Sequence, residues 1–126
     1  EPYQVSRAKI AEFAAALGDA GNPAYRGETP VAPPTFAVLL SSAAWGALFD
    51  DPELDLALSR TVHTDQRFTW SRPLRAGDEI TAQLTIEQVR LRGPMAIVTI
   101  AVRLATTGGE GVCTATSTLM HRAVAA

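Results

Sequence analysis

Few side chains in this sequence could take part directly in acid–base or nucleophilic chemistry near neutral pH. The chain has two histidines and one cysteine, and one of the histidines, His63, is followed closely by Asp65. An imidazole titrates close to neutral pH, so His63 could act as an acid–base group with Asp65 or with the more distant Asp19. Cys113 stands in an alternating segment without an activating neighbour, and we expect a buried thiol rather than a nucleophile.

The composition excludes several classes of protein. With 126 residues, of which 47% are hydrophobic, the chain is long enough for a single domain over residues 1–126 with its own core. The net charge of -2 and the scattered arginines predict no nucleic-acid partner, although a local basic patch could still meet an acidic carrier protein or a CoA phosphate. No apolar run approaches the roughly 20 residues of a membrane span, and no signal peptide is visible. The single cysteine cannot form an internal disulfide, so we expect a cytoplasmic protein without a membrane partner.

The first predicted element is an amphipathic helix from about Ser6 to Leu17. Ser6 suits the N-cap, Val5 can pack against Ile10, and Gly18 suits the end of the helix, where a left-handed residue is needed. Glycines and prolines then recur through residues 18–34 and predict an irregular loop. A loop of this length in a small domain is often functional.

A second helix is predicted over residues 35–49, and it leads into strands. Its side chains leave almost no polar face, so we expect it to be buried on nearly all sides. From residue 66 onward the apolar residues alternate, which predicts strands at 66–72, 80–87, 98–104 and 111–122, with a hairpin turn at 107–110. An antiparallel meander that wraps an apolar helix is an α+β arrangement.

Three segments together resemble one family, the MaoC-like dehydratases. Residues 18–25 (GDAGNPAY) resemble their G-D-x-N-P-x-H hydratase motif, and residues 31–36 (VAPPTF) resemble the entry into their central helix. Residues 62–68 and 72–78 look like the strand and turn of dehydratase-type N-terminal domains. The chain is most similar to the non-catalytic subunit of heterodimeric (3R)-hydroxyacyl-ACP dehydratases.

This resemblance implies a hot-dog fold, in which an antiparallel sheet wraps a long central helix, and it implies that hot dogs act in pairs. The implied reaction is the reversible dehydration of a 3-hydroxyacyl thioester to the trans-2-enoyl thioester, without a metal or cofactor. The family uses a carboxylate and a histidine as acid and base, and a backbone N–H at the start of the central helix to stabilise the thioester oxygen.

The sequence departs from this family pattern in two separate segments. Asp19 matches the carboxylate, but Tyr25 stands where the family has histidine, and Gly21 is inserted between them. A phenol with a pKa of about 10 is a poor base near neutral pH. The usual His-Gly pair at the helix entry is Pro33-Pro34 here, and proline has no N–H, so an amide donor would have to come from Thr35. We therefore expect that this chain does not perform the chemistry alone.

The resulting hypothesis is a subunit that binds the acyl chain of an acyl-ACP or acyl-CoA substrate and pairs with a catalytic MaoC-like hot-dog partner in fatty-acid or polyketide synthesis. The candidates for the degenerate catalytic site are Asp19, Asn22, Tyr25 and His63, and the candidates for substrate binding are Tyr25, Thr35, Trp45, Gln66 and Trp70. Each class also has a structural interpretation. Asp19 and Asn22 are ordinary turn residues, His63 could bond a neighbouring backbone group, and the tryptophans could be core or interface aromatics.

Three alternatives remain open at this point. The chain could be a self-sufficient homodimeric enoyl-thioester hydratase that uses His63. It could be a hot-dog thioesterase, although residues 35–49 contain no aspartate or glutamate to activate water. It could also be a non-enzymatic acyl-binding or assembly protein.

Overall fold

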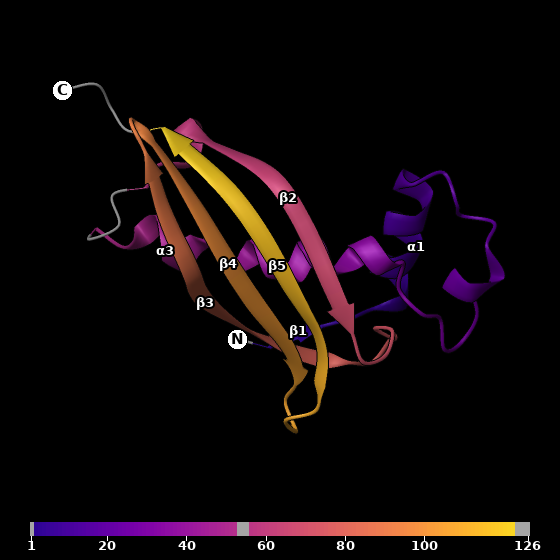
Figure 1. Cartoon of the computed structure of the whole chain (residues 1–126). Helices are drawn as coiled ribbons and strands as arrows, with labels where there is room; N and C mark the ends of the chain where they lie inside the picture. Colours follow the sequence, from indigo (N-terminus) through magenta and orange to yellow (C-terminus); the bar gives the residue numbers. More distant parts are fainter. Residues whose placement is uncertain (1, 53–55, 123–126) are drawn as a thin grey trace.

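The helical segment that follows the two prolines lies against the concave face of a curled antiparallel sheet (Figure 1). The computed structural model describes residues 2–52 and 56–122. The helices are α1 (Arg7–Ala16), α2 (Ala37–Ala43) and α3 (Gly46–Asp50), with 3₁₀ turns η1 (Pro23–Tyr25), η2 (Pro34–Phe36) and η3 (Leu58–Arg60). The strands are β1 (Tyr3–Gln4), β2 (Thr61–Trp70), β3 (Glu79–Arg92), β4 (Met95–Thr106) and β5 (Gly111–Arg122). None of the described helices is long and apolar enough to cross a membrane.

The five strands follow the order β1-β3-β4-β5-β2, and every neighbouring pair is antiparallel. Strands β3, β4 and β5 form the expected meander. The predicted meander is wrong for β2, which pairs with β5 and not with β3. The helices cross the concave face between β1 and β2, so these two strands lie at opposite edges of the sheet (Figure 1).

Alternate residues of β4 form the floor of the core. Val98, Ile100, Val102 and Leu104 are each at most 3% exposed. Phe36 and Leu40 from the central helical segment pack with Val102 and Leu104, whereas Leu48 of α3 packs with Val98 and Ile100. Burying one such large apolar side chain stabilises the fold by about 1.5–3 kcal/mol. The helical segment and the sheet therefore hold each other in place.

The first helix agrees with the prediction. The Ser6 side chain caps α1 by accepting a hydrogen bond from the Lys9 amide at 3.1 Å. Val5 and Ile10 are both buried in the same cluster, and Gly18 after the helix has a φ of 77°. Leu17 departs from the expected apolar face, because its side chain is 53% exposed.

The central helix differs from the prediction in two ways. It is broken into η2, α2 and α3 rather than continuous over residues 35–49. The Ser42 hydroxyl donates to the Val38 carbonyl at 2.6 Å, a bond that competes with the helical ladder just before the break. The helix is also not buried on nearly all sides: Leu39 is 37% exposed, and Ala43 and Ala47 are exposed. The sheet covers one side of the helix and leaves an apolar side uncovered.

The strand boundaries were predicted unevenly. The prediction was right for β5 and for the turn before it, where Gly109 has a φ of 100°. Strand β2 begins five residues earlier than expected, at Thr61 and not at Gln66, and β3 and β4 are longer at their ends. The two-residue β1 was not predicted, because so short a segment shows no alternation.

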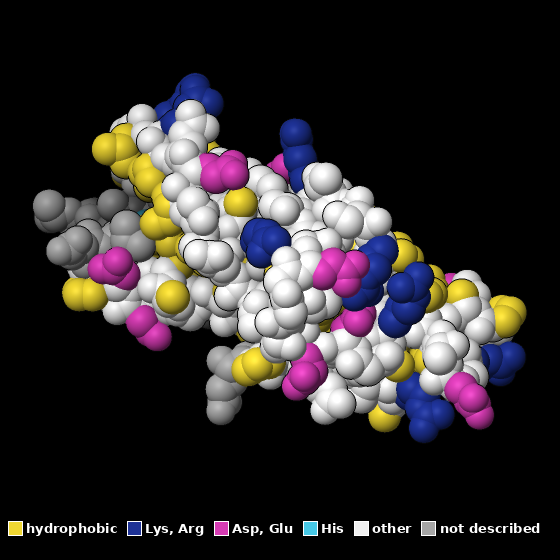
Figure 2. Space-filling view, turned by 90° about the horizontal axis from the view of Figure 1, so that it is seen from below, with side chains coloured by type: hydrophobic (Ala, Val, Ile, Leu, Met, Phe, Trp, Pro, Cys, Tyr) yellow, Lys and Arg dark blue, Asp and Glu magenta, His cyan; other side chains and the backbone are white. Residues whose placement is uncertain are grey.

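Arg72 fastens the turn between β2 and β3 to the β4–β5 hairpin. Its guanidinium donates to both carboxylate oxygens of Asp78 at 2.9 and 3.0 Å, and its Nε donates to Glu110 at 3.1 Å. Burial alone would raise the pKa of Asp78, but the bonds from Arg72 and from the Arg75 amide more than offset it and lower that pKa. Seen from below the view of Figure 1, the molecule shows positive and negative side chains interspersed over its surface (Figure 2).

We expect Asp78→Asn to lower the free energy of unfolding by about 2 kcal/mol at pH 7, because it removes the less exposed of the two carboxylates that pair with Arg72 and leaves only Glu110. The pKa of Asp78 is lower in the folded chain, so its stabilising effect is present above the unfolded-state pKa of about 4 and is lost as the pH falls through the folded-state pKa. Urea unfolding of both proteins at neutral and acidic pH measures the difference.

The matched control is Glu12→Gln, which removes the exposed Lys9–Glu12 ion pair. Exposed pairs contribute little, so we expect a change under about 1 kcal/mol. A loss in Asp78→Asn that stays the same at acidic pH would show that the charge is not its cause.

Candidate functional site

The loop that resembles the hydratase motif is held by hydrogen bonds among its own residues. The Asn22 side-chain amide donates to the Asp19 carboxylate at 3.2 Å, and the Asn22 side-chain oxygen accepts from the Ala24 amide at 3.0 Å. The second bond caps the turn η1, which ends at Tyr25. The Asp19 carboxylate and the Asn22 amide thus make the local bonds typical of turn residues.

Tyr25 lies between the loop and the core. Its ring packs against the main cluster and lines a hollow of about 340 Å³ beside Arg7 and Arg26. Its amide donates to the Asn22 carbonyl at 3.1 Å. A hydrogen bond within the loop therefore holds the Tyr25 backbone, and packing against the core holds its ring.

The entry into the central helix is rigid and has few free backbone N–H donors. Pro33 and Pro34 open η2, and the Phe36 amide already donates to the Pro33 carbonyl at 2.9 Å. Just before them, the Ala32 amide donates to the Leu74 carbonyl at 2.7 Å, which ties the entry to the β2–β3 turn. Thr35 is exposed and carries the first backbone N–H after the prolines.

Trp70 belongs to this helix entry. Its ring is tilted against Phe68, with centroids 6.1 Å apart, and it lines a hollow of about 210 Å³ with Ala32, Pro34 and Arg72. The structure thus brings Trp70, a candidate substrate-binding residue, next to Pro34, although the two residues are far apart in the sequence.

His63 lies elsewhere, near the start of β2, which is at the opposite end of the sheet from the loop (Figure 1). Its Nε2 donates to the Asp65 carbonyl at 3.0 Å, and its ring meets Trp45 edge-on with centroids 5.1 Å apart. The Asp65 carboxylate accepts from Arg67 at 3.1 Å. The alternative in which His63 pairs with the Asp65 carboxylate is therefore not present, and Asp19 is not brought to His63; the ring bonds a neighbouring backbone carbonyl, as in the structural interpretation.

Two polar side chains, Gln66 of β2 and Ser117 of β5, bond each other across the paired strands. Gln66 accepts a hydrogen bond from the buried Ser117 hydroxyl at 2.5 Å and donates to the Arg67 carbonyl at 3.3 Å. The Trp45 indole N–H is buried and finds no hydrogen-bond partner among the described residues. Ser117 was not expected here, since a serine in a threonine-rich strand gives no signal of burial.

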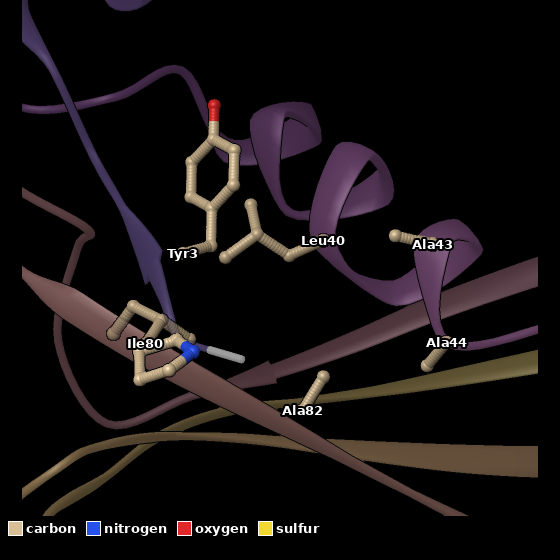
Figure 3. A pocket seen from close by; sticks show the side chains of 7 residues that line it. Tyr3, Leu40, Ala43, Ala44, Ile80 and Ala82 are labelled. Atoms are coloured by element: carbon tan, nitrogen blue, oxygen red, sulfur yellow. The ribbon is translucent and has the colours of Figure 1, made fainter.

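An apolar hollow opens between the central helix and the β1–β3 edge of the sheet. Figure 3 shows Tyr3 and Leu40 facing each other, with Ala43 and Ala44 on the helix and Ile80 and Ala82 on β3. Its volume is about 390 Å³. A second hollow of about 490 Å³ lies along the same helix and shares Ala43, with Trp45 and Phe49 in its wall. The small alanine side chains leave this space, which suits an apolar chain.

The chemical capacity of these groups is limited. Within residues 2–52 and 56–122, no cluster of histidine, cysteine, aspartate and glutamate could hold a metal ion. Cys113 is buried, as expected, and desolvation raises the pKa of its thiol to about 11 despite an opposing hydrogen bond with the Thr69 backbone. The last residue of α3, Asp50, carries a carboxylate, and this side chain is exposed.

Sequence comparisons identify the family. The model of the FAS1-like dehydratase domain region matches residues 1–115, and the chain belongs to this family. A relative in Cutibacterium acnes, the UPF0336 protein PPA1896, is 57% identical over 121 residues, which are 96% of this chain and 84% of the relative. A UPF0336 protein of Thermobifida fusca is 46% identical over 131 residues, covering 97% of this chain and 86% of the relative.

Structure comparisons agree. The chain is similar to the C-terminally truncated HadBC (3R)-hydroxyacyl-ACP dehydratase complex of Mycobacterium tuberculosis, with a TM-score of 0.83, 30% identity and coverage of 95% of this chain and 90% of that one. It also matches a MaoC-like dehydratase with a TM-score of 0.81 and 26% identity. The match covers 98% of this chain and 40% of the other, longer chain. The predicted α+β hot-dog fold and the membership of a MaoC-like dehydratase and hydratase family are confirmed.

We expect the Cys113 thiol to be nearly inert in the folded protein. With a pKa of about 11, about one thiol in a thousand is ionised at pH 8, against about a quarter at the reference pKa of about 8.5. Titration with a thiol-reactive disulfide reagent should therefore be at least about a hundredfold slower in buffer than in denaturant. Complete modification of the folded protein at the unfolded rate would contradict this assignment.

Proposed function

We propose that this chain is the acyl-binding subunit of a 3-hydroxyacyl-thioester dehydratase and pairs with a catalytic hot-dog partner. The reaction would be dehydration to the enoyl thioester, or hydration in reverse, on a substrate carried by ACP or CoA. The partner would supply the acid–base dyad and the oxyanion donor, and this chain would hold the acyl tail.

The observation that carries the proposal is the helix entry at Pro33 and Pro34. A thioester oxygen that gains negative charge needs a donor already aimed at it, and removing one such donor costs about a hundred- to a thousandfold in rate. Neither proline has an N–H, and the Phe36 amide is engaged with Pro33. In the preceding loop the Asp19 carboxylate accepts a hydrogen bond from Asn22, and Tyr25 stands where the family has its histidine. The entry therefore offers a backbone donor only at Thr35, shifted from the two prolines, and Tyr25 in place of a histidine base, which supports assigning the chemistry to a partner.

The capacity to hold an acyl tail rests on the two hollows along α2 and α3. They meet at Ala43, and their walls include Leu40, Ala44 and Phe49. Each methylene group moved from water into such a space contributes about 0.8 kcal/mol of binding free energy. A chain laid along the helix could thus be held without any polar contact.

A partner is supported by apolar surface that the described chain leaves uncovered. Leu39 on α2 is exposed. Three apolar side chains in the second half of β3 are also exposed: Ile86 at 37%, Val89 at 51% and Leu91 at 78%. Exposed apolar side chains of this size are suited to a protein interface. The HadBC complex, to which this chain is similar, is itself a (3R)-hydroxyacyl-ACP dehydratase assembly.

The first test is hydration of an enoyl thioester by the purified chain, alone and mixed with a MaoC-like protein encoded beside it. We expect no activity from the chain alone and full activity from the mixture, because the acid–base dyad would come from the partner. His63→Phe, which keeps an aromatic ring against Trp45, should leave the activity of the mixture within about threefold. Activity of the chain alone that is lost in both His63→Phe and His63→Ala would instead place catalysis at His63.

The second test fills the hollow between the central helix and the β1–β3 edge with a large side chain. We expect Ala44→Phe to lower turnover of long-chain enoyl thioesters by the mixture at least about tenfold, while turnover of the short crotonyl thioester changes little, because a short tail does not reach the hollow. Ala15→Phe, at an exposed position of α1, is the size-matched control. Equal losses for long and short substrates would mean that the hollow does not hold the tail.

A further inference from the structure

The outer face of the sheet carries a basic and apolar surface where β5 ends and β2 begins, at the upper left of Figure 1. Two rows of residues that are aligned across neighbouring strands make up this surface, because paired residues in antiparallel strands point to the same face of the sheet. One row is Arg92, Met95 and Arg122, and the other is Arg90, Ile97, Met120 and Val62. Together with Arg60 we call these residues the arginine-rimmed surface.

This surface faces away from the helices. Val98 and Leu119, which alternate with its residues along β4 and β5, pack beneath Leu48 on the opposite face. Val62 is 63% exposed, and a hollow of about 410 Å³ lies among Val62, Met95 and Met120. Methionine side chains are flexible and adapt to the shape of a partner.

The charge of the surface is uncompensated in the described part of the chain. The Arg60 Nε donates to the Arg122 carbonyl at 3.0 Å, which holds these two arginines at one edge. Among residues 2–52 and 56–122, no ion pair joins a carboxylate to any of the four arginines. The nearest acids along the strands are Asp65, which is bound to Arg67, and the exposed Glu87 on β3. A chain of net charge -2 thus concentrates positive charge at one place.

We propose that the arginine-rimmed surface docks a small acidic protein that presents carboxylates around apolar side chains, namely the acyl carrier protein of the substrate. The proposal rests on the proposed function, because a dehydratase acting on a carrier-bound thioester must bind that carrier. Charges at the rim speed association and select the partner, whereas the apolar centre supplies contact area.

The chemistry of the surface argues against other occupants. A second copy would bring arginines against arginines, and like charges repel. A membrane-binding surface is usually marked by tryptophan or phenylalanine, neither of which is among these residues. A free phosphate would gain nothing from the methionines and isoleucine at the centre.

The test measures binding of the apo form of an acyl carrier protein, which lacks the prosthetic arm and so cannot use the acyl hollow. We expect the double variant Arg90→Glu/Arg92→Glu to weaken binding at least about tenfold at low ionic strength, and the wild type to lose affinity as salt rises. The control Arg7→Glu/Arg26→Glu makes the same change of charge beside the loop and should bind like the wild type. Equal thermal unfolding of the variants excludes misfolding.

Three results would overturn the docking surface: no binding of the apo carrier at low salt, equal weakening in both double variants, or binding of phosphatidylglycerol vesicles in place of the carrier. Turnover of a CoA thioester by the chain mixed with its partner reports separately on the proposed function, since this substrate has no carrier to dock. An inactive mixture that still binds the carrier through Arg90 and Arg92 would refute the proposed function and leave the docking surface standing.

Discussion

The structure depends on covering one apolar helical segment. Phe36, Leu40 and Leu48 must leave water, and a sheet that curls around them accomplishes this with alternate residues of a few long strands. The need for cover explains why β1 and β2 lie at opposite edges, because the chain enters the concave face at one edge and leaves at the other. It also explains the fastening by Arg72, which keeps the β2–β3 turn closed over the helix entry.

The same entry shows how a residue can suit folding and be unsuited to catalysis. Proline at the start of a helix costs nothing in hydrogen bonding, because the first N–H groups of a helix have no partner within it. Those unpartnered groups are the donors that a thioester oxygen would use. Pro33 and Pro34 thus favour the helix start and leave Thr35 to carry the first N–H, which is the basis of the proposed division of work between this chain and a partner.

The two faces of the sheet are suited to different contacts. The concave face and the exposed side of α2 are apolar and hollowed beside Ala43, as the proposed binding of an acyl tail and a partner requires. The outer face is rich in threonine and arginine, and its charge collects where Arg92, Met95 and Arg122 align. A protein with little net charge can therefore hold a strongly basic surface, because register and not composition decides which arginines become neighbours.

The sequence by itself determined the local elements: the capped helix α1, the loop with Asp19 and Asn22, the proline entry, the last strand and, by resemblance, the hot-dog family. These follow from spacing along the chain, where capping and alternation act between near neighbours. Only the tertiary structure decided that β2 pairs with β5, that the central helix breaks before Gly46 and keeps one side exposed, and that His63 meets Trp45 and not the Asp65 carboxylate. Those outcomes depend on which distant strands share an edge, and the energy of that choice lies in packing between residues far apart in the sequence.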